Sequence, residues 1–116
     1  MKIHSMTLDA QHFENVASNK KIYELRVFDE KRRNILLGNK IIFTKKNSDE
    51  TVTKTISKIL LFDNFRDALS TVNLEELLPG IGSLDDGVRL YENIPHSTGT
   101  YKEGAQQFGL VMFKFV

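Results

Sequence analysis

The sequence contains no cysteine, no tryptophan and only two prolines among its 116 residues. Without cysteine, the chain has neither a disulfide framework nor a zinc site built on thiolates. Its three histidines, at positions 4, 12 and 96, are too scattered to give the spacing of zinc ligands. We therefore expect no metal ion and no cofactor.

Long apolar runs are also missing. The apolar segments have the length of strands, well short of the about 20 residues that a membrane-spanning helix needs. The first residues lack the apolar core of a signal peptide, so we expect a cytoplasmic protein that does not enter a membrane. With 41% hydrophobic and 27% charged residues, residues 1–116 have the size and composition of one domain with its own core.

The sequence has little net charge, only +1, so the molecule as a whole should attract nucleic acid weakly. The charges are nevertheless unevenly distributed. Residues 19–45 are rich in lysine and arginine, whereas residues 63–93 are acidic on balance. A basic face is compatible with RNA binding, although a solvated basic hairpin explains the same pattern.

Hydrophobic alternation and turn residues predict an α+β domain in which strands predominate. We expect strands over residues 1–7, 21–28, 40–45, 51–62 and 108–116. We expect a first helix over residues 9–18 with Asp9 as its cap, and three short helices capped by Asp63, Asn73 and Ser83. Residues 29–34 and 94–107 are expected to be polar loops. This order favours a twisted, partly closed β-barrel with short helices over its openings.

The most informative segment is Asn19-Lys20-Lys21-Ile22-Tyr23-Glu24-Leu25-Arg26. Asn19 suits a left-handed helix stop. In the strand that follows, alternation places Tyr23 and Leu25 on the core face, and Glu24 and Arg26 together on the other face. Lys21 lies in the preceding turn, from which it can reach the same side.

This segment resembles the signature Gly-x-Lys-x-x-Glu-x-Arg of the ASCH (activating signal cointegrator homology) domain, a small RNA-associated module of the PUA-like superfamily. Lys21, Glu24 and Arg26 match the signature, and Asn19 stands where the glycine is usual. Further similar segments, in the same order and spacing, are Phe28-Asp29-Glu30-Lys31-Arg32, Gly38-Asn39-Lys40-Ile41-Ile42-Phe43 and Phe108-Gly109-Leu110-Val111. The resemblance implies a PUA-like barrel.

The chemistry of these residues suits a nucleotide. Lys21 offers a compact cation and Arg26 a planar fork for phosphate or a base edge, while Glu24 can accept from a base amine or ring N–H. Arg32 and Arg33 in the adjacent loop could extend the phosphate track. Candidate stacking rings are Tyr23, Phe28, Tyr91 and Tyr101. The simpler alternative is that Glu24 and Arg26 only pair with each other.

Two classes of function follow. The first is an RNA- or nucleotide-binding module with a cleft lined by Lys21, Glu24 and Arg26. The second is a small amidohydrolase or ribonuclease that uses Lys21 and Glu24 as proton-transfer groups. Some ASCH-like proteins remove the acetyl group of N4-acetylcytidine with a threonine nucleophile, but Glu24 occupies that position here, which argues against the same route. A protein-interaction domain on an inherited barrel is a third option.

Overall fold

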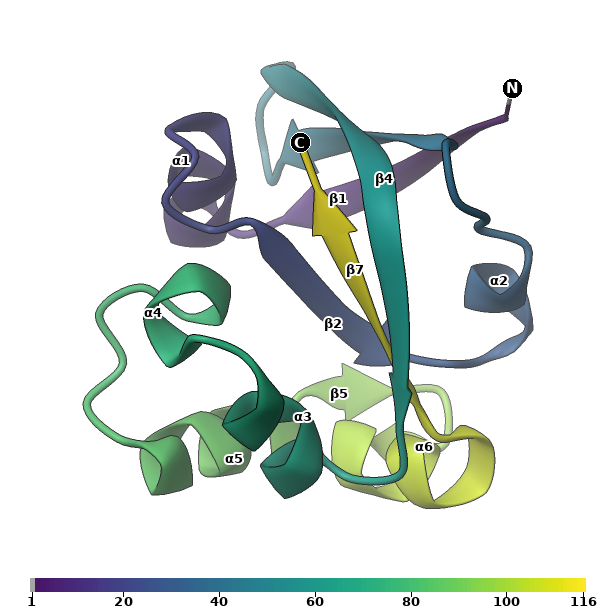
Figure 1. Cartoon of the computed structure of the whole chain (residues 1–116), viewed down its shortest axis with the longest axis vertical. Coiled ribbons are helices and arrows are strands. Elements are labelled where there is room, and N and C mark those ends of the chain that lie inside the picture. Colours follow the sequence, from purple (N-terminus) through teal and green to yellow (C-terminus); the bar gives the residue numbers. More distant parts are fainter. Residues whose placement is uncertain (1) are drawn as a thin grey trace.

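The computed structural model of the protein describes residues 2–116. They form a curled five-stranded sheet, a partly closed barrel, with helices packed around it (Figure 1). The strand order in the sheet is β1-β3-β4-β7-β2. The strands are β1 (Ile3–Leu8), β2 (Tyr23–Val27), β3 (Lys40–Lys45), β4 (Thr51–Phe62) and β7 (Leu110–Phe115).

The first two strands of the sequence lie at the two edges of this sheet. β1 pairs in parallel with β3, whereas all other neighbours in the sheet are antiparallel. β2 pairs with β7 at the opposite edge. Because the sheet curls, the two edge strands approach each other and leave an opening between them, which we call the seam.

Six helices and a small hairpin complete the described part of the chain. α1 follows β1, α2 follows β2, and the other helices gather at one end of the sheet (Figure 1). None of the helices within residues 2–116 has the length and apolar character needed to cross a membrane. They are α1 (Ala10–Ala17), α2 (Glu30–Arg33), α3 (Phe65–Thr71), α4 (Leu74–Leu77), α5 (Leu84–Glu92) and α6 (Tyr101–Phe108), and the hairpin is β5 (Pro95–His96) with β6 (Gly99–Thr100).

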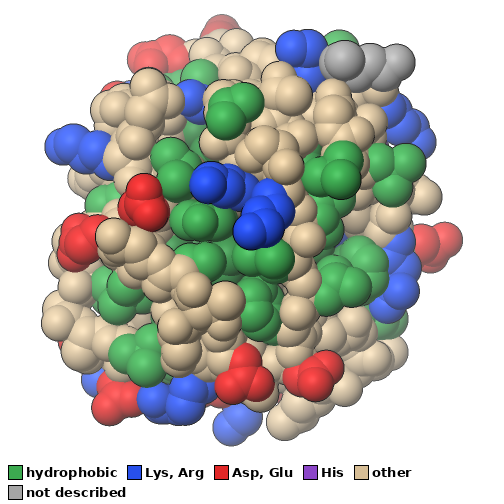
Figure 2. Space-filling model, in the orientation of Figure 1, with side chains coloured by type: hydrophobic (Ala, Val, Ile, Leu, Met, Phe, Trp, Pro, Cys, Tyr) green, Lys and Arg blue, Asp and Glu red, His purple; other side chains and the backbone are tan. Residues whose placement is uncertain are grey.

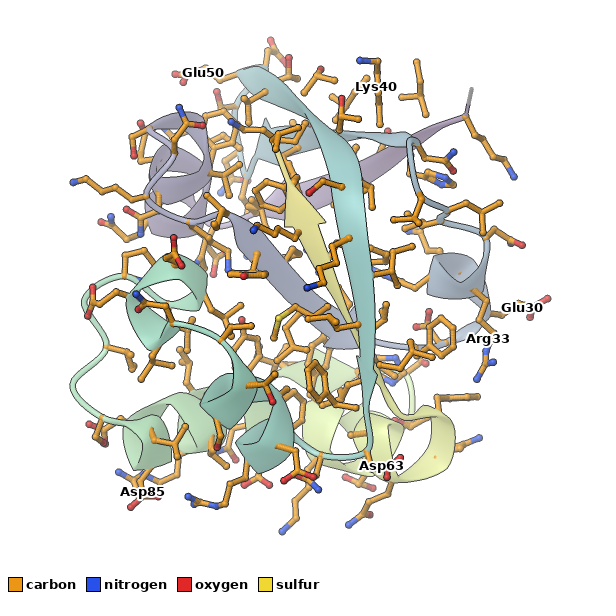
Figure 3. All side chains as sticks on the ribbon, viewed as in Figure 1. Glu30, Arg33, Lys40, Glu50, Asp63 and Asp85 are labelled. Atoms are coloured by element: carbon orange, nitrogen blue, oxygen red, sulfur yellow. The ribbon has the colours of Figure 1, made fainter. Side chains whose placement is uncertain are left out.

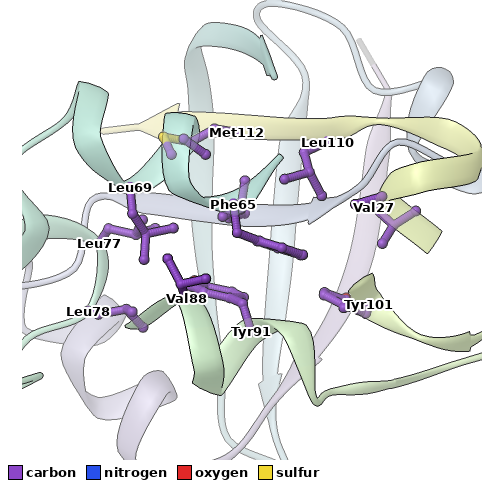
Figure 4. Close-up of a cluster of buried hydrophobic side chains, with 13 residues drawn as sticks. Val27, Phe65, Leu69, Leu77, Leu78, Val88, Tyr91, Tyr101, Leu110 and Met112 are labelled. Carbon is purple, nitrogen blue, oxygen red and sulfur yellow. The ribbon is translucent and has the colours of Figure 1, made fainter. Parts of the chain in front are cut away.

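The core consists of two clusters, one on each face of β7. Successive side chains of a strand point to opposite faces, so Leu110 and Met112 enter one cluster, while Val111 and Phe113 enter the other. The first cluster lies beneath α3, α5 and α6, where the rings of Phe65 and Tyr91 stack with centroids 5.4 Å apart (Figure 4). The second fills the curl of the sheet and is closed by α1.

A β-bulge in β4 allows one long strand to serve both clusters. Ile56 pairs with Phe115, but the register shifts before the next pair, Lys58 with Lys114. The shift keeps Ile56 and Ile59 both on the side of the second cluster, while Leu60 turns to the first. An extra residue in one strand of an antiparallel pair has this effect on side-chain direction.

The predicted strands over 21–28, 40–45, 51–62 and 108–116 are confirmed to within a few residues. The predicted first strand is β1, except that residue 1 lies outside the described residues. Asn19 ends α1 with φ 66°, the left-handed conformation that was expected there. The hydrophobic pattern and the turn residues thus located the whole sheet correctly.

The prediction of a charged loop over residues 29–34 is wrong, because these residues form the short helix α2. Asp29 caps it by accepting a hydrogen bond from the backbone N–H of Arg32. No residue of α2 is buried, so the segment carries no hydrophobic periodicity, and its local cap is the only sequence signal.

The prediction of a long polar loop over residues 94–107 is also wrong. The segment contains the hairpin of β5 and β6 and then α6. The Thr100 hydroxyl accepts from the backbone N–H of Glu103 and donates to the Glu103 carboxylate, so Thr100 caps the start of α6. Gly104 lowers helix propensity in the middle of this segment, which is why the sequence did not indicate a helix there.

The helix caps were predicted with mixed success. Asn73 and Ser83 accept from backbone N–H groups as expected. The cap of α3 is Asn64 rather than Asp63, since the Asn64 side chain accepts from the N–H of Asp67 at 2.9 Å. Asp9 occupies the cap position of α1, but its side chain makes no capping hydrogen bond.

Candidate functional site

A cleft of about 290 Å³ opens at the seam. The end of β1 and the start of α1 form one side, β2 forms the floor, and the segment from α5 to α6 forms the other side. We call it the seam cleft. Its titratable lining residues are Asp9, His12, Lys21, Glu24, Arg26, Tyr91 and Tyr101.

Lys21 lies at the inner end of the seam cleft and is almost completely buried, at 1% exposed. The left-handed turn at Asn19 and a hydrogen bond from the Lys21 N–H to the carbonyl of Asn15 direct the chain into β2. The Lys21 ammonium donates to the carbonyl oxygen of Leu77 at 2.6 Å and lies 3.4 Å from the Glu24 carboxylate. The buried charge is therefore compensated within the protein.

Glu24 and Arg26 lie on the same face of β2, as alternation predicted. Arg26 Nε donates to the Glu24 carboxylate at 2.7 Å, and its Nη2 donates to the carbonyl oxygen of Thr7 at 3.4 Å. The simpler alternative considered for the sequence, a pairing of Glu24 with Arg26, is thus present. It does not remove these groups from the cleft, because both still line it.

The two cations determine the charge state of Glu24. Burial alone raises the pKa of its carboxyl, but Arg26 and then Lys21 outweigh burial and lower the pKa below its usual range. Burial lowers the pKa of Lys21, and Glu24 opposes this only in part. The pKa of Arg26 is raised by Glu24 against the effect of burial. At neutral pH, Glu24 is therefore an anion, and it lies between the Arg26 guanidinium and the Lys21 side chain.

His12 is a lining residue that the sequence did not reveal as part of a site. It projects from α1 into the seam cleft. Burial and the nearby Lys21 charge lower its pKa, with Glu24 acting in the opposite direction. Its ring is therefore neutral at neutral pH and offers one donor and one acceptor. Only the packing of α1 against the seam brings it near Lys21, and no local sequence pattern encodes that contact.

Two of the four aromatic candidates lie at the seam cleft. Tyr91 and Tyr101 form part of its wall, but both are buried, and both stack on Phe65 at centroid distances of 5.4 and 6.3 Å. They close the cleft rather than offer a free face. Tyr23 points to the opposite face of β2, and Phe28 packs against the second core cluster.

Arg32 and Arg33 do not line the seam cleft. Arg32 lies 3.7 Å from Asp29, the residue that caps its own helix. Arg33 lies over the ring of Phe28 at 4.3 Å and donates to the carbonyl of Phe108. Figure 3 shows Arg33 at the end of α2, on the side of the molecule away from α1. The structure thus brings together three of the five residues predicted from the sequence.

Within residues 2–116, no three histidine or acidic side chains are grouped so that they could hold a metal ion. The chemistry of the seam cleft is instead that of paired charges and a neutral imidazole. Lys21 and Arg26 supply basic groups, and Glu24 and Asp9 supply acidic ones, so the cleft suits a polar ligand that offers both an anionic group and donor-bearing ring edges.

No protein-family model matches the sequence, and no curated protein matches it significantly. Among solved structures, the hypothetical protein PH0355 is similar over 99% of this chain and 97% of its own, with a TM-score of 0.82 and 28% identity. The solution structure of PF0455 from Pyrococcus furiosus has a TM-score of 0.71 and 24% identity, and the similarity covers 99% of this chain and 96% of that protein.

A structure described as ASCH is also similar. The ASCH protein of Zymomonas mobilis matches 97% of this chain and 65% of its own, with a TM-score of 0.58 and 16% identity. At this identity the likeness concerns the fold alone, and it agrees with the curled five-stranded sheet described above. The chain therefore has the ASCH-like fold that its signature segment led us to expect.

Proposed function

We propose that this protein binds a nucleotide, or an unpaired base of RNA, in the seam cleft. The observation that carries the proposal is the convergence of Lys21, Glu24 and Arg26 with the neutral ring of His12 on one cleft. The ASCH-like fold supports the same proposal, because ASCH domains are RNA-associated modules.

The size of the seam cleft favours a small ligand. Its volume of about 290 Å³ is at the lower end of the ~300–1,000 Å³ range of ligand pockets. Such a space accommodates one base with part of its sugar, and a longer strand would have to continue outside it. RNA recognition often takes this form, in which a single unpaired base enters a pocket.

The burial of each charged group indicates its role. Lys21 is enclosed and serves chiefly to hold Glu24. Arg26 is more accessible, with 15% of its side chain exposed, and it lies where a phosphate at the cleft mouth would meet it. Glu24 can accept hydrogen bonds from an exocyclic amine or a ring N–H through the carboxylate lone pairs that Arg26 does not use.

Calorimetric titration with the four ribonucleoside monophosphates tests this proposal. We expect binding that Arg26→Gln weakens at least about tenfold, the usual effect of losing a charge-assisted hydrogen bond. Arg66→Gln is the matched control, because Arg66 makes an ion pair of the same 2.7 Å length on an exposed surface. Arg33→Gln tests the sequence prediction for the α2 arginines, and the position of Arg33 leads us to expect no effect.

A readout at the site completes the test. The NMR signals of the His12 ring should shift on addition of nucleotide, and its pKa should rise as a phosphate enters the seam cleft. Absence of binding by all four monophosphates, or equal affinity in Arg26→Gln and Arg66→Gln, would contradict the proposal. Thermal melting confirms beforehand that each variant is folded.

A second candidate function is hydrolysis, and one observation favours it. Burial lowers the pKa of Lys21, which moves its amine toward the range of a general base. The lowered pKa of Glu24 argues against its serving as a proton donor at neutral pH. If the protein is a hydrolase, Lys21→Met should abolish turnover of N4-acetylcytidine or a short RNA. No turnover by the unmodified protein on either substrate would exclude this activity for both.

A further inference from the structure

A row of three side chains crosses the sheet on the face opposite to Glu24. Lys58 of β4 is the register partner of Lys114 of β7, and Lys114 is the register partner of Tyr23 of β2. The Lys114 ammonium lies 5.9 Å from the centre of the Tyr23 ring. We call these three residues the lysine row. None of them contributes to the seam cleft.

The two lysines of this row are unfavourably placed for stability. Like charges directly opposite each other on neighbouring strands repel. Within residues 2–116, neither ammonium has an acidic group at ion-pair distance. Figure 2, which looks onto β4, shows basic side chains at the centre of this face beside apolar surface, with acidic side chains to their left and toward the lower edge.

The β-bulge at Ser57 creates this pairing. Ile56 faces Phe115, so an unbroken ladder would place Ser57 opposite Lys114. The extra residue moves Lys58 into that position instead. The bulge satisfies the packing of Ile56 and Ile59, but packing does not require a lysine at position 58, which is exposed. Bulges commonly aim side chains at functional surfaces.

We infer that the lysine row is a second contact surface for single-stranded nucleic acid. The phosphates would lie on Lys58 and Lys114, and a base would stack against the accessible part of the Tyr23 ring. Paired cations beside an aromatic ring are the elements with which proteins hold single strands without reading their sequence. This inference does not depend on ligand binding in the seam cleft.

The test uses a labelled oligouridine of about 12 nucleotides, within the range of single-strand site sizes. Its affinity is measured by fluorescence anisotropy at several salt concentrations. Each lysine–phosphate contact should contribute about 0.7 to the magnitude of the slope of log affinity against log salt concentration. In the double variant Lys58→Gln/Lys114→Gln, the magnitude of this slope should therefore fall by about 1.4. That change corresponds to roughly tenfold weaker binding at about 200 mM salt.

Two further variants isolate the roles. Tyr23→Leu should weaken binding by about fivefold or more through lost stacking and leave the salt slope unchanged. Lys46→Gln/Lys102→Gln removes two exposed lysines outside the row and should have little effect. Binding of uridine monophosphate should be the same in the lysine-row double variant as in the unmodified protein, which separates this surface from the seam cleft.

Several outcomes would overturn the inference. The first is an equal affinity and an equal salt slope for oligouridine in the two double variants. The second is an unchanged affinity in Tyr23→Leu. The third is a glutamate-rich peptide that binds as tightly as the oligouridine. The last result would identify an acidic protein partner instead. Loss of oligouridine binding in Arg26→Gln alone would assign the strand to the seam cleft and not to the lysine row.

Discussion

Arg26 joins the two edge strands of the sheet through its contact with Thr7. One end of the guanidinium donates to the Thr7 carbonyl oxygen at the end of β1, and Nε holds the Glu24 carboxylate on β2. A single side chain thus spans the seam and fixes the acid of the candidate site. Its removal should affect both the stability of the fold and the charge state of Glu24.

Replacement of Arg26 by glutamine should therefore reduce the free energy of unfolding by about 2–3 kcal/mol, because a buried carboxylate loses its nearest cation. The matched variant is Arg66→Gln. Arg66 and Asp85 are also 2.7 Å apart, but both side chains are more than half exposed, so a loss of at most about 1 kcal/mol is expected. Urea denaturation measures both. Equal losses would show that the burial of the Glu24–Arg26 pair contributes nothing.

Acid should selectively weaken the contribution of Glu24. Its pKa is lower in the folded protein than in the unfolded chain, where glutamate titrates near pH 4.3. Because the unfolded state binds the proton first, this contribution is fully present above about pH 5 and is lost as the pH falls through the folded pKa. The difference in stability between the unmodified protein and Glu24→Gln should consequently shrink as the pH falls below about 5.

The corresponding control is Glu14→Gln. Glu14 pairs with Lys45 at 2.9 Å, but its side chain is 54% exposed, so the substitution should change stability little at any pH. Urea denaturation at a series of pH values gives both differences. A Glu24 difference that stays constant across the series would contradict the lowered pKa.

The His12 ring should report on the charge of Lys21. The Lys21 ammonium contributes to the lowered pKa of His12, so Lys21→Met should raise that pKa. The change is measured by following the His12 ring signals in an NMR pH titration. The signals of His4 and His96 indicate in the same spectra whether the fold is intact. An unchanged midpoint for His12 would place Lys21 too far away to act on it.

Gly87 in α5 allows this helix to approach α3. A methyl group at position 87 would lie 2.7 Å from Leu69 Cδ2. Gly87→Ala should therefore destabilise the protein by about 1 kcal/mol, because an overpacking cost of ~1–3 kcal/mol exceeds the helix-propensity gain of just under 1 kcal/mol. The double variant Gly87→Ala/Leu69→Ala should lose less stability than the sum of the losses in the two single variants, because Leu69→Ala removes the clash. Strict additivity in urea denaturation would contradict this account.

The sequence predicted the sheet well because alternation is a local signal. Leu25 and Val27 are core residues and Glu24 faces the other side, as the period of two requires. The short helices were harder to predict. α2 has no buried residue, and Gly104 interrupts the propensity of α6, so each helix depends on a single cap that hydrophobic periodicity does not detect.

The charged residues of the candidate site were predicted together because they lie in or next to one strand. Lys21, Glu24 and Arg26 follow one another within β2 and its entry, so alternation and the family resemblance brought them together. His12 comes from α1, and only the packing of this helix against the seam places it in the cleft, so the sequence did not reveal it. Tyr101 of α6 was named as a stacking candidate, but it is buried and forms part of the wall. Arg33 was expected to extend the site because it is near Arg26 in the chain, but its side chain packs on Phe28 instead.

The pairing of β2 with β7 has a consequence for biosynthesis. Tyr23 finds its register partner in Lys114, so the charged residues of β2 leave the ribosome long before the strand that fixes them. Until residues 110–115 have been made, Lys21, Glu24 and Arg26 have no sheet to hold them together. Contacts of such high sequence separation form late and slowly. The seam cleft should therefore form last, and a nascent chain lacking β7 should not yet contain it.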